Sequence, residues 1–207
     1  MPLWSLFRPT LQFLDAGPLI DGDLELVEPS RRYLEDVLAA CRHPTTLAGA
    51  PDMARVTRQG LIRFLDNTPF GHVAGRPGKD PSPAYHFWMR LTNAHGPGDI
   101  PIRMAGGIGL RIGDTPNLRQ FIGHVGYNVY PAARGRHLAE RATRLLLPLA
   151  RRHGLTTLWI TCNPDNVPSH RTCQRLGATY VDTVDLPLNH DLYVRGERKK
   201  CRYRLEL

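Results

Sequence analysis

Residues 126–143 of this 207-residue chain have the sequence GYNVYPAARGRHLAERAT. The first part alternates like a strand and runs through Pro131 into an Arg-Gly-Arg turn, and the second part has the composition of a helix. Such a turn leaves backbone N–H groups without partners at the helix start, where the helix dipole is positive. Helix starts of this kind bind phosphate groups. We therefore expect the backbone here, with Arg134 and Arg136, to hold a phosphorylated cofactor.

The basic residues are concentrated in the same half of the chain. The net charge is +8, and from Pro131 onward 14 Arg and Lys residues face seven Asp and Glu residues, whereas residues 1–130 are almost balanced. An anionic ligand would be attracted to the basic half. An Arg-rich composition with solvated side chains would explain the excess of basic residues equally well. The sequence contains no nucleic-acid-binding motif.

The composition, 42% hydrophobic and 22% charged, is typical of a globular protein. We expect one domain over residues 1–207, with residues 1–22 as an N-terminal arm. No apolar stretch has the length of a membrane span, and the N-terminal residues lack the pattern of a signal peptide. The four cysteines form no CxxC pair and have no His at metal-ligand spacing, which favours reduced thiols and no metal. These features predict a cytoplasmic protein.

Periodicity and turn residues predict a mixed sheet of about seven mostly antiparallel strands with helices on both faces. The Gly106-Gly107 pair inside one strand suggests a bulge or a close backbone approach. Gly154 should end the long helix, and Pro148 should kink or shorten it. Residues 71–83, rich in Gly and Pro, indicate a loop. Strands are expected at residues 24–27, 85–91, 102–112, 121–130, 157–162, 179–184 and 201–207, and helices from near Ser30, from near Asp52, at about 134–153 and at 167–176.

Two motifs in this order resemble those of the GNAT superfamily of acyl-CoA-dependent N-acetyltransferases. Residues 129–139, VYPAARGRHLA, are similar to the family's Arg/Gln-x-x-Gly-x-Gly/Ala pyrophosphate loop. Asn166-Val167-Pro168-Ser169, followed by RLGA at 175–178, is similar to the family's Asn-x-x-Ala/Ser…Leu-Gly-Phe segment. Either motif alone is weak, but both at this separation are specific. The resemblance covers residues 85–207 and is greatest, through His124 and residues 126–129, to a bacterial branch of predicted acetyltransferases.

The resemblance implies an α/β acyltransferase that moves the acetyl group of acetyl-CoA to a primary amine by direct attack on the thioester. The acceptor is not implied; it is a small molecule or an exposed amino group. The acetyl-CoA-binding core would be residues 126–178, and the Val129 N–H would stabilise the oxyanion. Dimers are common in the family, so a homodimer is also implied. The residues expected to bind the cofactor are Tyr127, Asn128, Val129, Arg134, Gly135, Arg136, His137, Leu138, Ala139, Asn166 and Ser169.

Two positions depart from the family pattern. His137 replaces a glycine, and we expect it to have a negative φ, as in a helical first turn, so that its N–H still donates. Cys173 occupies the position of the tyrosine that protonates the leaving thiolate. Cys173 could donate that proton, or it could simply be packed in the core, with water or Tyr180 acting instead.

The remaining assignments each have a structural alternative. His124 is the candidate base, because an ordinary imidazole titrates near neutral pH, but it could equally pack or hydrogen-bond to a carbonyl. Asn166 could contact the cofactor, cap the helix after it, or do both. Glu25, Asp36 and Asp52 are candidates for an acceptor pocket or solvated side chains.

Three other functions compete with the transferase. A degenerate module could bind acyl-CoA without turnover, since two family positions are altered. A basic transferase could act on an amine linked to nucleic acid. A dinucleotide-binding oxidoreductase is disfavoured, because no Gly-x-Gly-x-x-Gly turn follows the first strand.

Overall fold

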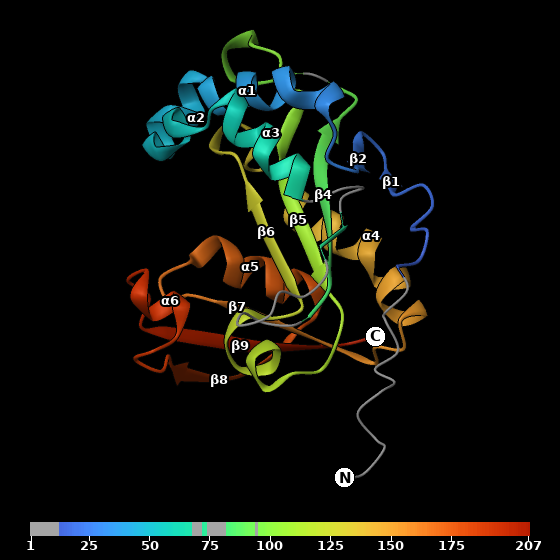
Figure 1. The fold of residues 1–207 in the computed structure, drawn as a ribbon, viewed down its shortest axis with the longest axis vertical. Helices are drawn as coiled ribbons and strands as arrows, with labels where there is room; N and C mark the ends of the chain where they lie inside the picture. Colours follow the sequence, from blue (N-terminus) through green and yellow to red (C-terminus); the bar gives the residue numbers. More distant parts are fainter. Residues whose placement is uncertain (1–12, 68–71, 74–81, 94) are drawn as a thin grey trace.

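The structure, a computed structural model, describes residues 13–67, 72–73, 82–93 and 95–207. Within them, the strands form one mixed sheet in the order β1-β2-β4-β5-β6-β7-β9-β8, with β3 paired to β4 (Figure 1). Neighbouring strands are antiparallel, apart from the parallel pair of β6 and β7. The strands are β1 Ile20–Asp21, β2 Leu24–Val27, β3 His72–Val73, β4 Ala84–Leu91, β5 Met104–Arg111, β6 Val125–Val129, β7 Thr157–Cys162, β8 Thr179–Asp185 and β9 Lys199–Glu206. The predicted fold class is confirmed.

Helices cover both faces of the sheet. Phe64 of α3 packs against the His86 and Trp88 rings of β4, whereas His153, which caps α4, packs against Tyr85. Because successive strand residues point to opposite faces, α3 and α4 lie on opposite sides. Figure 1 shows α1–α3 together at one end of the molecule and α5 beside α6 at the other. The helices are α1 Leu34–Arg42, α2 Pro44–Gly49, α3 Arg58–Asn67, α4 Leu138–Arg152, α5 Val167–Leu176 and α6 Asp191–Val194.

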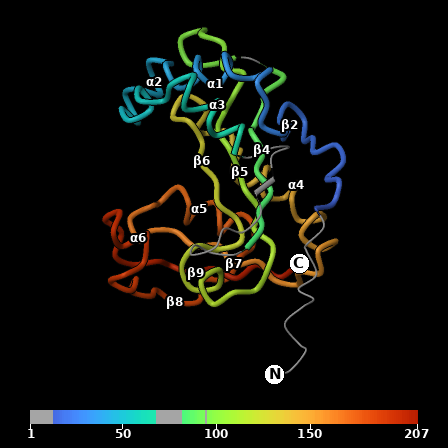
Figure 2. The backbone as a smooth tube through the Cα atoms, viewed as in Figure 1, coloured from blue at the N-terminus to red at the C-terminus, as the bar shows by residue number. Residues whose placement is uncertain are grey.

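Strands β6 and β7 diverge. Their pairing consists of Val125 with Ile160, whereas β6 remains paired to β5 from Val125 to Val129. The traces in Figure 1 and Figure 2 separate beyond that point, with β6 running toward α2 and β7 running alongside β9. Among the described strands, the backbone edge of β6 beyond Val125 therefore has no partner on the side of β7.

The strand predicted at residues 121–130 is shorter than expected. A π-helical turn, Leu118–Ile122, takes up its first residues, and Gly123 closes that turn with a φ of 69°. Glycine adopts a positive φ readily, and this conformation interrupts regular strand geometry, so β6 begins only at Val125. At the start of the chain, β1 lies within the predicted arm, of which residues 1–12 are outside the described part.

The expected irregularity at Gly106-Gly107 is confirmed. The β4–β5 register shifts there, since Met89 pairs with Gly106 but Arg90 pairs with Met104. A Cβ on Gly106 would lie 2.1 Å from the Asn128 carbonyl oxygen, so only glycine fits against β6. Pro148 does not shorten α4, which continues to Arg152. The loop predicted at 71–83 lies mostly outside the described residues.

The N-terminal helices differ in detail from the two that were expected. Ser30 precedes a short 3-10 turn, Arg31–Tyr33, that leads into α1, and its side chain makes no capping hydrogen bond. The helix expected from near Asp52 is a 3-10 turn, Pro51–Arg55, followed by α3. Helix α2 was not predicted.

Candidate functional site

The segment between β6 and α4 presents a row of unpaired amides. The N–H of Arg134 donates to the Pro131 carbonyl at 3.2 Å, and the first helical bond runs from the Arg141 N–H to the His137 carbonyl at 3.0 Å. Between them, no group in the described residues accepts a hydrogen bond from the N–H groups of residues 135–140. We call these N–H groups the amide cradle. They lie at the positive end of the 15-residue helix α4, where an anionic group is stabilised.

The backbone of the cradle turns through two left-handed residues. Gly135 has a φ of 85° and His137, at the N-cap of α4, has a φ of 55°. The expectation of a negative φ at His137 is therefore wrong. Residues 134–137 precede the helix instead of forming its first turn, and a glycine-like conformation is imposed on a residue with a Cβ.

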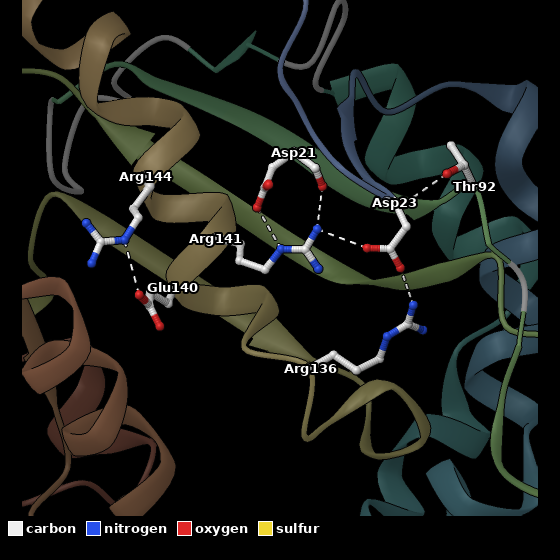
Figure 3. Close-up of polar contacts among 7 residues, drawn as sticks. All are labelled: Asp21, Asp23, Thr92, Arg136, Glu140, Arg141 and Arg144. Atoms are coloured by element: carbon white, nitrogen blue, oxygen red, sulfur yellow. Dashed lines mark hydrogen bonds and ion pairs between the residues drawn. The ribbon is translucent and has the colours of Figure 1, made fainter.

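Arg136 does not contribute a free charge to the cradle. Its guanidinium pairs with Asp23, which follows β1, and Arg141 pairs with Asp21 and Asp23 at 2.7 and 2.9 Å (Figure 3). Burial acts to raise the pKa of Asp23, but the hydrogen bond from Arg141 and the charge of Arg136 outweigh it and hold that pKa below its ordinary value. This ion-pair cluster, which the sequence did not reveal, fixes the start of α4 to the β1–β2 hairpin.

Unlike Arg136 and Arg141, Arg134 keeps its charge available to a ligand. Its Nε donates to the Val129 carbonyl at 3.3 Å, and within the described part of the chain no carboxylate pairs with it. The side chain is exposed beside the cradle. A diphosphate bound to the cradle would therefore meet the exposed guanidinium of Arg134.

The unpaired edge of β6 carries backbone groups of two candidate residues. The Tyr130 N–H donates to Ala105 on the β5 side at 2.8 Å. Peptide groups alternate in direction along a strand, so those of Tyr127 and Val129 point to the opposite side, where β7 diverges. The Asn128 side chain lies on the β5 side, and its Oδ1 accepts a hydrogen bond from Gly107 at 3.0 Å.

Helix α5 contacts strand β6 through a pair of hydroxyl groups, one from each element. The Tyr127 hydroxyl and the Ser169 Oγ are 2.9 Å apart, and burial raises the pKa of Tyr127 to about 12. The Asn166 Oδ1 accepts the Ser169 N–H at 3.2 Å, which is the N-cap bond that the sequence predicts. The Ser169 hydroxyl does not cap the helix; it contacts Tyr127 instead.

The geometry of His124 favours a structural role. The side chain is 1% exposed, its Nδ1 accepts the Trp159 N–H at 2.9 Å, and its Nε2 is 2.9 Å from the Gly113 carbonyl. Nε2 must then carry the proton and donate it to that carbonyl. Burial also lowers the pKa of the ring. With both nitrogens engaged, neither has a lone pair free to accept a substrate proton.

Cys173 and Tyr180 are likewise poorly placed to donate a proton. Cys173 is 0% exposed within the core, and burial raises its pKa to about 12. This geometry agrees with the alternative of a packed thiol. Tyr180 lies on the outermost strand, β8, where its hydroxyl contacts Thr183 at 2.9 Å.

Two of the three candidate acceptor carboxylates lie at one cavity. Asp36 lines a pocket of about 300 Å³ between α1 and the ends of β4 and β5, and Glu25 pairs with Arg90 in its wall at 2.5 Å. Asp52 is exposed and pairs with Arg55. The arginines of this pocket were not predicted, although the Glu25–Arg90 pair on neighbouring strands is a contact that strand alignment could have suggested.

Neither a metal site nor a membrane-spanning helix is found among the described residues. No group of three His, Cys, Asp or Glu side chains there is arranged to hold a metal ion. None of the described helices combines the length and apolar character of a membrane span.

A helix start with unpaired amides thus lies beside two diverging parallel strands, as expected for the acyltransferases that the two sequence motifs resemble. A family model described as the acetyltransferase (GNAT) domain matches residues 23–179, so this chain belongs to the GNAT acetyltransferase family. The resemblance noted in the sequence is confirmed. The sequence matches none of the curated proteins at a significant level.

Solved structures share the fold at low sequence identity. A candidate ribosomal-protein-serine acetyltransferase from Vibrio cholerae has a TM-score of 0.60 and 18% identity over 92% of this chain and 97% of its own. An acetyltransferase from Salmonella typhimurium, described as modifying the N-terminal serine of the ribosomal protein L7/L12, has a TM-score of 0.57 and 16% identity over 90% and 96%. The microcin C7 self-immunity acetyltransferase, solved with acetyl-CoA and AMP, has a TM-score of 0.59 and 16% identity over 90% and 94%.

Proposed function

We propose that this protein transfers the acetyl group of acetyl-CoA to a primary amine. The observation that carries the proposal is the amide cradle, residues 135–140, at the positive end of α4. Unpaired N–H groups at a helix start satisfy the oxygens of a diphosphate, and coenzyme A has one. The exposed guanidinium of Arg134 would add a charge-assisted contact. Binding of acetyl-CoA by the microcin C7 enzyme supports the choice of cofactor.

The unpaired edge of β6 would hold the pantetheine arm. The N–H groups of Tyr127 and Val129 and the Tyr127 carbonyl face the side where β7 diverges, so they are available to pair with the amides of the arm as a strand would, whereas the Val129 carbonyl already accepts a hydrogen bond from Arg134. The thioester would then lie beside the Val129 N–H. A donor held in this way stabilises the oxyanion that forms when the amine attacks, typically by a few kcal/mol.

The chemistry needs a neutral amine and a proton for the departing sulfur. The amine nitrogen bonds to the thioester carbon and loses a proton to water, the carbon–sulfur bond breaks, and the thiolate of coenzyme A takes up a proton, so no net proton is released. The Tyr127–Ser169 hydroxyl pair is held in the fold as Cys173 is, and burial raises the pKa of Tyr127 to about 12, so water is our candidate proton source. Catalytic roles for His124 and Cys173 remain untested predictions that this burial does not favour.

Coenzyme A binding tests the cradle directly. Gly135→Glu places a carboxylate next to the diphosphate, and we expect calorimetric titration to show at least a hundredfold weaker binding of coenzyme A. Gly154→Glu is the matched control, since Gly154 also has a positive φ, 76°, has open space around its Cα, and lies beyond the opposite end of α4. Equal affinities of the two variants would contradict the assignment.

Turnover separates the enzyme from the acyl-CoA-binding module that the sequence left open. Acetyl-CoA is incubated with a panel of amines, including peptides with a free N-terminal serine, and the released thiol is measured. The serine peptides are chosen because of the acceptor described for the Salmonella structure. Tight binding without thiol release from any amine would favour the module. A cytoplasmic location, one domain over residues 1–207 and a homodimer remain predictions.

A further inference from the structure

The polar pocket between α1 and the sheet is lined from three parts of the chain. The 3-10 turn before α1 and the first turn of α1 form one wall, the end of β4 forms the second, and the segment entering β5 forms the third. Its volume is about 300 Å³. The lining residues are Arg32, Tyr33, Asp36, Arg90, Leu91, Thr92 and Arg103.

Three guanidinium groups give this pocket a positive character. Arg90 is held by Glu25 at 2.5 Å, and the guanidinium carbon of Arg32 lies 5.4 Å from the centre of the Tyr33 ring. In the part of the chain that the structure describes, no carboxylate forms an ion pair with Arg32 or Arg103. Among the described residues that line the pocket, Asp36 is the carboxylate that opposes them, and Glu25 neutralises Arg90 from outside the lining. A guanidinium pair of this kind is suited to carboxylate or phosphate, which it binds through two parallel hydrogen bonds.

The pocket lies close to the proposed reaction centre along the sheet. The Leu91 N–H donates to the Arg103 carbonyl at 2.8 Å, which fixes the third wall against the end of β4. Gly106 pairs with Val129, the residue whose N–H would meet the thioester. Arg103 and Gly106 are three residue steps apart along the chain, which is about 10 Å in an extended strand.

We propose that this pocket binds an anionic group of the acceptor, a carboxylate or a phosphate, and so selects amines that carry such a group about 10 Å away. The inference rests on the proposed transferase function, because it names the acceptor class of the same site. In an extended peptide with its N-terminal amine at the thioester, the anionic group would belong to about the third or fourth residue, at 3.3 Å per residue.

Matched peptides test the selectivity in turnover. Hexapeptides with an N-terminal serine, alanine elsewhere and one Asp at the second, third, fourth or fifth residue are compared with the same peptides carrying Asn. A parallel set carries phosphoserine, which separates phosphate from carboxylate recognition. We expect kcat/KM to be at least tenfold higher for the anionic peptides, with the maximum at the third or fourth residue. Arg103→Gln should remove the difference through KM, while Arg55→Gln, at an exposed arginine outside the pocket, should retain it.

A binding measurement makes failure of this inference distinguishable from failure of the proposed function. The same peptides, labelled at the C-terminus, are titrated by fluorescence anisotropy against protein saturated with coenzyme A. Tighter binding of anionic peptides that Arg32→Gln and Arg103→Gln abolish supports the pocket, even if no peptide is acetylated. Equal binding of the Asp, Asn and phosphoserine peptides, or a preference that survives both substitutions, would overturn it.

Discussion

The backbone conformation at the start of α4 can be tested by substitution, because it decides whether a given variant raises or lowers the free energy of unfolding. In the structure, Gly135 and His137 are both left-handed, with φ of 85° and 55°. A left-handed conformation costs a residue with a Cβ about 1–2 kcal/mol, whereas glycine avoids this cost but loses about 0.5–1 kcal/mol more chain entropy on folding. His137→Gly should therefore raise the free energy of unfolding by up to about 1 kcal/mol. Gly135→Ala should lower it by a similar amount.

The alternative geometry gives the opposite signs. If the helix began at Arg134, as the sequence suggested, both residues would lie in right-handed turns. His137→Gly would then cost about 1 kcal/mol as a helical glycine, and Gly135→Ala would gain about as much. Thermal and denaturant unfolding would measure the difference, since 1 kcal/mol shifts Tm by about 2–4 °C in a protein of this size.

Two controls complete the experiment. His137→Val should destabilise the protein more than Gly135→Ala does, because a β-branched residue tolerates a left-handed backbone poorly. Coenzyme A affinity should change little in His137→Gly, which keeps its N–H in the amide cradle. A less stable His137→Gly together with a more stable Gly135→Ala would refute the cradle geometry.

Three further predictions concern residues that position the site. His124→Ala should cost about 2–4 kcal/mol of stability, because it leaves a cavity and two unpaired backbone groups, while the shape of the pH–rate profile stays that of the wild type; a lost titration would restore His124 as the base. Burial lowers the pKa of His124 in the folded protein, so on acidification the unfolded imidazole binds a proton first. The free energy of unfolding of the wild type, measured with denaturant, should therefore decline as the pH falls below about 6.5. The decline should be smaller in His124→Ala. Asp23→Asn should cost about 1–2 kcal/mol near neutral pH by loosening Arg136 and Arg141, and the gap to the wild type, complete above about pH 4, should narrow as pH falls through the lowered pKa of Asp23; a constant gap would exclude the charge as its cause. Gly106→Ala should cost about 3 kcal/mol or more, because its Cβ would overlap the Asn128 carbonyl, and circular dichroism with thermal unfolding would detect it; wild-type stability would contradict this packing.

Much of the fold could be predicted from local patterns. Helix α5 was expected at residues 167–176 and observed there, because a capping residue, apolar spacing and a final glycine all mark its limits. Strand β7 was expected at residues 157–162 and is also present, since its apolar residues alternate. Local signals failed where a tertiary contact decides the conformation. The turn at Leu118–Ile122 replaced the first residues of the strand predicted at 121–130, and the His124 ring after it is fixed by Gly113 and Trp159.

The candidate site, too, was predictable from the sequence only where its features are local. The family and the approximate position of the helix start with its unpaired amides followed from the order of the residues, since motif spacing and helix geometry are local properties. The sequence could not show that Arg136 is neutralised by Asp23, or that the pocket arginines gather at Asp36, because those partners are more than fifty residues apart in the chain or belong to different elements.

The sequence by itself determined that strand, turn and helix follow one another at residues 126–143, and with this the family and its cofactor class, because these depend on near neighbours in the chain. Only the tertiary structure decided which charges and imidazoles remain free to act. Burial and partners contributed by distant strands set the availability of His124, Cys173 and Arg136, and no local pattern encodes them.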